Sequence, residues 1–154
     1  MTETEIQKTL IAHFDGEGYK TWPPEGKCKH GHGPDVVAYH PDRHHLWIIE
    51  AKSDVKNSST DPSGGINRSL NFGDALRQIC QRRAGEWKPK TGCGPLLPSD
   101  IVTYGLAFSE DYRPLCHQIR PEVRLVLSLY LFFLRPDDSI PTIIGPHVED
   151  INSV

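Results

Sequence analysis

Two apolar segments joined by a short polar turn constrain the fold of this 154-residue chain most strongly. The first reads Pro-Asp-Val-Val-Ala-Tyr over 34–39, and the second reads Leu-Trp-Ile-Ile-Glu-Ala-Lys over 46–52. The pair Pro41-Asp42, in the turn between the two segments, is typical of a type I turn. The pattern therefore predicts a β-hairpin. Side chains alternate along a strand, which puts Glu50 and Lys52 on one face and Ala51 on the other.

The charged residues at the open end of this hairpin indicate a functional site. Asp35 begins the first strand, and Glu50 and Lys52 end the second. Burying charges is costly unless they are paired or bind a metal, so an apolar strand that ends in charges needs an explanation. Two carboxylates and a lysine can hold a divalent cation and position a water, which suits phosphodiester cleavage. The alternative is a hairpin in which Glu50 and Lys52 form an ordinary ion pair.

The rest of the chain predicts an α/β fold. Thr2 and Glu5 have the spacing of a capping box, and apolar residues at helical spacing predict a first helix that ends near Phe14. The other predicted helices are 71–84 and 112–119, the other predicted strands are 19–22, 101–108, 123–134 and 140–144, and 53–68 and 85–98 are predicted loops. This order predicts a mixed β-sheet flanked by helices, in one domain over residues 1–154.

Composition excludes several classes of protein. A hydrophobic content of 37% and a charged content of 24% fit a globular chain. No apolar run is long enough to cross a bilayer, and the acidic N-terminus does not resemble a signal peptide, so we expect no membrane association. Four scattered cysteines favour a reducing compartment, and therefore the cytoplasm. Walker and Rossmann glycine patterns are missing, so nucleotide binding is unsupported.

Basic residues concentrate in one part of the chain. The net charge of −3 argues against nonspecific coating of nucleic acid. Between positions 64 and 99, however, six basic residues stand against two acidic ones. The six are Arg68, Arg77, Arg82, Arg83, Lys88 and Lys90. This segment is a candidate surface for a phosphate backbone, and the alternative is a solvated helix face.

Taken together, Pro34-Asp35 and, after fourteen intervening positions, Glu50-Ala51-Lys52 resemble the signature of the PD-(D/E)xK nuclease superfamily. This superfamily includes restriction endonucleases and Holliday-junction resolvases. Two further features resemble it: Gln78 in the helix after the hairpin, and Glu5 (or Glu3) in the helix before it. The resemblance extends over about 2–108 and implies a restriction-endonuclease-like fold.

The resemblance also implies roles for individual residues. Asp35, Glu50 and the main-chain carbonyl of Ala51 would bind Mg²⁺, for which Mn²⁺ would substitute. Lys52 would orient the attacking water and offset charge in the transition state, with Gln78 in support. Glu5 would be a further acid near the metal.

The sequence thus predicts a Mg²⁺-dependent endonuclease that cleaves DNA with structure selectivity or weak sequence selectivity. By analogy with the superfamily, it is a candidate homodimer with residues 123–134 at the interface. The alternatives are an inactive nuclease fold that binds nucleic acid or serves in assembly, and a zinc-binding structural protein that uses Cys28, His30 and His32. The histidines of the hairpin turn, His40, His44 and His45, are expected to be exposed to solvent.

Overall fold

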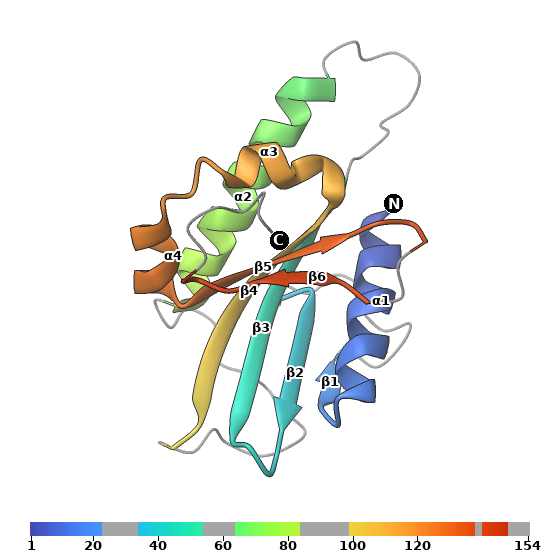
Figure 1. The fold of residues 1–154 in the computed structure, drawn as a ribbon, viewed down its shortest axis with the longest axis vertical. Helices are drawn as coiled ribbons and strands as arrows, with labels where there is room; N and C mark the ends of the chain where they lie inside the picture. Colours follow the sequence, from blue (N-terminus) through green and yellow to red (C-terminus); the bar gives the residue numbers. More distant parts are fainter. Residues whose placement is uncertain (23–33, 54–63, 84–98, 138–139, 148–154) are drawn as a thin grey trace.

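The computed structural model describes residues 1–22, 34–53, 64–83, 99–137 and 140–147 (Figure 1). Its helices are α1 (Glu3–Gly16), α2 (Gly64–Arg83), α3 (Arg113–Cys116) and α4 (Pro121–Leu127), with a 3₁₀ turn η1 (Glu110–Tyr112). Its strands are β1 (Lys20–Trp22), β2 (Val36–His40), β3 (His45–Lys52), β4 (Ile101–Ser109), β5 (Leu129–Leu134) and β6 (Thr142–Ile144). The described strands form one six-stranded sheet in chain order.

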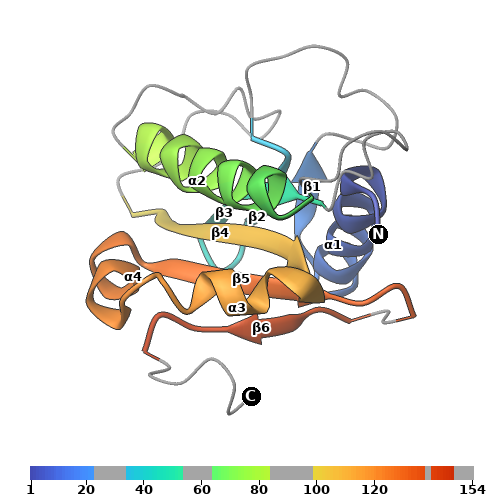
Figure 2. The same cartoon turned by 90° about the horizontal axis from the view of Figure 1, so that it is seen from above.

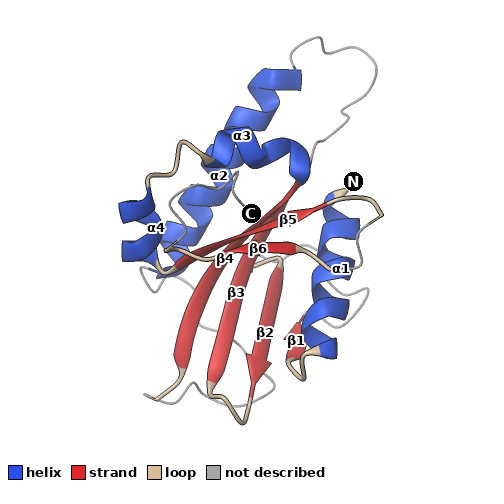
Figure 3. Ribbon diagram, in the orientation of Figure 1, coloured by secondary structure: helices blue, strands red, loops and turns tan. Residues whose placement is uncertain are grey.

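The sheet is mixed, as predicted. β3 pairs with β4 in parallel and β4 with β5 in parallel, whereas the other three pairings are antiparallel. Helices flank this sheet, which confirms the predicted fold class (Figure 3). None of the described helices is long and apolar enough to cross a bilayer.

Each face of the sheet has its own apolar core. On one face, Ile6, Leu10 and Phe14 of α1 pack against residues such as Trp47 and Ile49 of β3. On the other face, the core combines α2, η1 and α3 with alternate residues of β3, β4 and β5; its helical members include Phe72, Ala75, Ile79, Tyr112 and Cys116 (Figure 2). β3 is therefore covered on both sides, which explains why it reads as a nearly continuous apolar run.

The first helix matches its prediction closely. Thr2 is the N-cap of α1, and its side chain accepts a hydrogen bond from the backbone N–H of Glu5. The Glu5 carboxylate accepts one in return from the N–H of Thr2, at 2.6 Å, which completes the capping box. The helix ends at Gly16, and Gly18 follows with a φ of +83°, a conformation that suits glycine.

Helix α2 begins earlier than predicted. The sequence prediction started it at Asn71, whereas the structure starts it at Gly64, inside a segment predicted as loop. Two glycines lower the helix propensity of this first part, and Leu70 is exposed, so no apolar stripe marks it. The residues of α2 that pack in the core begin at Phe72. Once this part is helical, extending the helix toward Gly64 costs little.

The prediction of one strand over 123–134 was wrong in its first half. Residues 121–127 form α4, and only the remainder forms β5. Pro121 starts α4 at a position that favours proline, whereas Ser128 ends it in a left-handed conformation with a φ of +49°. The apolar run misled because α4 exposes Val123, Leu125 and Val126 while it buries Arg124.

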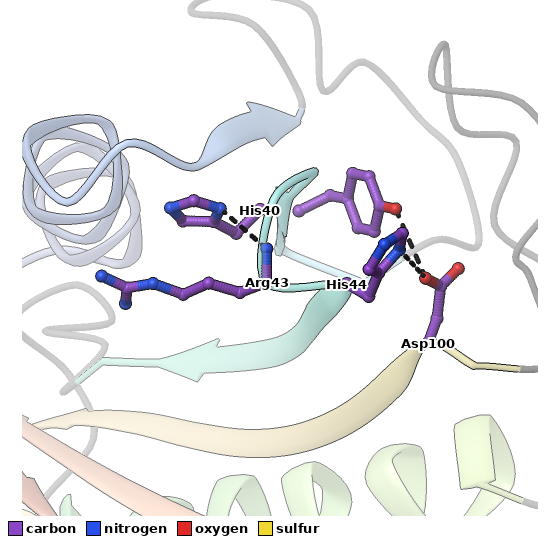
Figure 4. A network of polar contacts seen from close by, with 5 residues as sticks. His40, Arg43, His44 and Asp100 are labelled. Atoms are coloured by element: carbon purple, nitrogen blue, oxygen red, sulfur yellow. Dashed lines mark hydrogen bonds and ion pairs between the residues drawn. The ribbon is translucent and has the colours of Figure 1, made fainter.

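The turn between β2 and β3 holds a polar network at the opposite end of β3 from Lys52 (Figure 4). His44 adopts a φ of +50°, and its Nδ1 lies 3.3 Å from Asp100 Oδ1. His45 was expected to be exposed but is half-buried, because its ring lies between the hydroxyls of Tyr19 and Thr103. Burial lowers the pKa of His45, with smaller contributions from Arg43 and His40.

Candidate active site at the end of strand β3

The register of the hairpin brings the predicted acids together. In the antiparallel pairing of β2 with β3, Val36 lies opposite Ile49. Asp35 immediately precedes β2, in a bend, and Glu50 immediately follows Ile49 in β3. The two acids therefore lie at the same end of the hairpin.

Asp35 precedes β2, and its side chain takes the place of a backbone acceptor for β3. Its Oδ2 accepts a hydrogen bond of 2.7 Å from the backbone N–H of Ala51. In a strand the N–H and C=O of one residue point to the same side, so the carbonyl of Ala51 also faces the β2 side of β3. Pro34, the residue before Asp35, has no N–H and cannot donate to this carbonyl.

Glu50 and Lys52 share the α2 face of the sheet, as the alternation predicted, while Ala51 packs in the core on the α1 face. Glu50 is 1% exposed, an unusual degree of burial for an acidic residue. The side chain of Lys52 is 18% exposed, and its Nζ lies 3.9 Å from Oε2 of Glu3. The last residues of β3 thus combine a buried acid with an accessible ammonium group.

Of the two acids considered on the first helix, Glu3 lies beside the site and Glu5 does not. Glu5 is exposed and engaged with Thr2 in the capping box, so the assignment of Glu5 to the site is corrected to Glu3. Burial raises the pKa of Glu3, the charge of Asp35 raises it further, and Lys52 opposes both. The predicted capping box itself was the signal that separates the two residues, because it already uses the Glu5 carboxylate.

Sequence reasoning missed Gln7. This residue follows Glu3 by one helical turn, and its Nε2 donates a hydrogen bond of 3.4 Å to Oδ1 of Asp35. The spacing of four residues was the available signal, because it puts both side chains on one face of α1. Helix α1 therefore contacts Lys52 through one residue and Asp35 through the other.

Gln78 lies on α2 beside the core residue Ile79. Its Oε1 is buried and has no hydrogen-bond donor within the described residues. Leaving a buried acceptor unsatisfied costs about 1–3 kcal/mol, so a ligand that donated to this oxygen would gain that amount in affinity. The role of Gln78 stays a prediction.

The basic residues of α2 are less free than their sequence suggests. Arg77 lies 3.3 Å from Asp74 and donates to Gln81 at 2.9 Å, while Arg68 lies 3.9 Å from Asp111. Arg82 and Arg83 belong to α2, but their side chains lie outside the described residues, as do Lys88 and Lys90. The candidate zinc residues Cys28, His30 and His32 lie outside them too.

The donor set fits Mg²⁺ better than a metal that needs a closed protein cage. Within the described ranges, no three His, Cys, Asp or Glu side chains are close enough to share one ion. Mg²⁺ usually keeps several waters and is bound through one or two carboxylates. Asp35, Glu50 and the Ala51 carbonyl would be such a set, and each Asp35 oxygen accepts one hydrogen bond here and retains a further lone pair.

The fold belongs to the α/β class, with a mixed six-stranded sheet flanked by helices, and one solved structure shares this fold. The crystal structure of an XisH family protein from Nostoc punctiforme is similar, with a TM-score of 0.51 and 12% sequence identity over 89% of this chain and 95% of that one. A second crystal structure, of an fdxN element excision controlling factor protein from Anabaena variabilis, gives a TM-score of 0.40 and 13% identity over the same shares. No family model and no curated protein sequence matches the chain.

Proposed function

We propose that this protein is a metal-dependent nuclease that hydrolyses phosphodiester bonds in DNA. The observation that carries the proposal is the hydrogen bond from the Ala51 N–H to Asp35, which ties the first acid of the motif to the strand that holds Glu50 and Lys52. The nuclease-like fold supports the same function. Fold alone does not define activity, so the proposal depends on these side chains.

Asp35 and Glu50, together with the carbonyl of Ala51, would hold Mg²⁺, and Mn²⁺ would substitute for it. The bound cation would supply charge that polarises a phosphate and lowers the pKa of water. Lys52 contributes a fixed positive charge and three donors, which stabilise negative charge as it develops on the phosphate oxygens. Oε2 of Glu3 lies 3.9 Å from the Lys52 ammonium at the end of β3.

The proposal extends to the substrate and the setting. DNA is the proposed substrate, with the basic residues of α2 as its phosphate contacts and Gln78 as a hydrogen-bonding group near the site. We propose structure-selective or weakly sequence-selective cleavage. A homodimer in the cytoplasm is the proposed form, and its interface would use α4, because β5 is covered by neighbouring strands on both sides.

The direct test is a cleavage assay. The purified protein would be incubated at low salt with linear duplex, single-stranded and four-way-junction DNA, each with Mg²⁺, with Mn²⁺ or with chelator. The Glu50→Ala variant should lose all metal-dependent cleavage. Glu17→Ala is a matched control, because Glu17 is exposed at the C-terminal end of α1, and it should cleave like the wild type. Equal cleavage by Glu50→Ala and the wild type would contradict the proposal.

The alternative function is that of an inactive nuclease fold that binds nucleic acid or serves in assembly. Thermal unfolding with and without Mn²⁺ separates the two functions, because a ligand that binds only the folded protein raises its Tm. DNA binding without either cleavage or a Mn²⁺-dependent shift would favour the inactive fold.

A further inference from the structure

We propose that Gln7 is a positioning residue that fixes the carboxylate of Asp35 for metal binding. This inference rests on the proposed function and adds a residue to which the nuclease signature gives no role. Two donors hold the Asp35 carboxylate: the Ala51 N–H bonds Oδ2 at 2.7 Å, and Gln7 Nε2 bonds Oδ1 at 3.4 Å.

The two donors constrain Asp35 in different ways. The bond from Ala51 connects the carboxylate to β3 but leaves it free to rotate about its own axis. The bond from Gln7 acts on the other oxygen and comes from a separate element, α1. Together they determine the plane of the carboxylate, and with it the direction of the lone pairs that remain for a cation. Partners of this kind orient ligands in many metal sites.

The environment of Gln7 supports this role. Gln7 is half-buried, and the neighbouring Ile6 and Leu10 are fully buried, so α1 is held firmly against the sheet. The amide is neutral, and it therefore donates to Asp35 without adding a positive charge that would repel a cation. A lysine or arginine at this position would hold the same oxygen but would oppose metal binding.

The experiment measures Mn²⁺ affinity by isothermal titration calorimetry on the full chain. Gln7→Met keeps the length of the side chain and removes the donor, and Gln7→Ala removes the donor with the best helix former. Both should raise the Kd for Mn²⁺ about tenfold, the lower end of what such partners contribute. Thermal unfolding in EDTA identifies a Gln7 variant that does not fold. The Kd is then measured on the other Gln7 variant.

Gln81→Met and Gln81→Ala are the matched controls, because Gln81 is a half-buried helical glutamine that hydrogen-bonds Arg77 rather than Asp35. They should leave the Kd unchanged. If the wild type binds Mn²⁺ and both Gln7 variants bind it equally well, the role of Gln7 is wrong and the proposed function stands. If the wild type binds no Mn²⁺, the proposed role of Gln7 and the proposed function are both wrong.

Discussion

The Oδ2 atom of Asp35 lies 2.7 Å from the backbone nitrogen of Ala51, from which it accepts a hydrogen bond. The bond joins the residue before β2 to the penultimate residue of β3, where a backbone carbonyl would otherwise be the acceptor. Pro34, the residue before Asp35, has no N–H and cannot donate to the Ala51 carbonyl. The Asp35 side chain thus satisfies the N–H of Ala51, and the proposed cation would use its C=O.

This relationship predicts the effect of Pro34→Ala. The substitution gives residue 34 a backbone N–H, which would compete with the proposed cation for the Ala51 carbonyl. An ordinary hydrogen bond contributes about 1 kcal/mol, so the affinity for Mn²⁺ should fall about fivefold in calorimetry. Pro41→Ala, in the turn at the other end of the hairpin, is the control and should bind normally. Unchanged affinity in Pro34→Ala would mean that the carbonyl is not a ligand.

Lys52 offers a prediction on the rate of cleavage. Lys52→Met removes the ammonium but keeps most of the apolar stem, so the fold should be retained. Loss of one preorganised donor to a developing charge costs about 100-fold or more in rate. Single-turnover cleavage under saturating Mg²⁺ is the measurement. Lys8→Met, on the exposed side of α1, is the control; comparable rates for Lys52→Met and the wild type would exclude Lys52 from the chemistry.

Glu3 and Glu5 should respond to pH in opposite ways. The raised pKa of Glu3 means that the folded state binds its proton more tightly than the unfolded state does. Glu3 therefore costs no stability below the unfolded pKa, and its cost grows as the pH rises through the folded pKa. In EDTA at pH 7, Glu3→Gln should raise the free energy of unfolding by about 0.5 kcal/mol at most, because a partly exposed side chain is screened.

Hydrogen bonds from Thr2 lower the pKa of Glu5, so the effect of this residue on stability has the opposite sign to that of Glu3. Its contribution is present above the unfolded pKa and is lost as the pH falls through the folded pKa. Glu5→Gln should therefore lower the Tm at pH 7, and this difference from the wild type should shrink toward pH 3. Paired thermal melts across this range check both residues. Shifts of the same sign at pH 7 would contradict the assignment of Glu3 to the site.

Gly105 in β4 packs so closely in the core that a side chain at this position should destabilise the protein. A Cβ at this position would lie 2.7 Å from Cε2 of Phe132 and 3.1 Å from Cγ1 of Ile49, both fully buried. Gly105→Ala should therefore destabilise the protein by about 1–3 kcal/mol in urea unfolding. Gly73 is the matched control, because it lies on α2 with nothing within 4 Å of its Cβ position. Gly73→Ala should stabilise by about 0.5–1 kcal/mol.

The sequence predicted those parts of the fold in which local pattern and tertiary packing agree. The hairpin, the capped first helix and strand β4 follow from period-two alternation, capping chemistry and a long apolar run. The prediction for residues 121–127 was wrong because the usual burial pattern is inverted there: Arg124 is 1% exposed, whereas Val126 is 71% exposed. No rule based on apolar spacing identifies such a helix, and only Pro121 hinted at its start.

The candidate site could be predicted only in part, for a similar reason. Asp35, Glu50 and Lys52 follow from strand alternation and register, which are local properties. The contacts from Glu3 and Gln7 depend on how α1 crosses the sheet, and spacing along the chain does not determine this. The sequence could name the face of α1 that carries both residues, but it could not say which element that face meets.

The pairing of β3 with β4 also governs when the site can form. His44 and Asp100, which lie at the start of this pairing, are 56 positions apart in the chain, whereas β2 and β3 are neighbours in a hairpin. Closing so long a connection costs more entropy and slows folding. Glu50 and Lys52 acquire their final surroundings only once β4 is in place. During synthesis on the ribosome, a chain that has not yet released β4 would therefore carry the acids and the lysine without an assembled site.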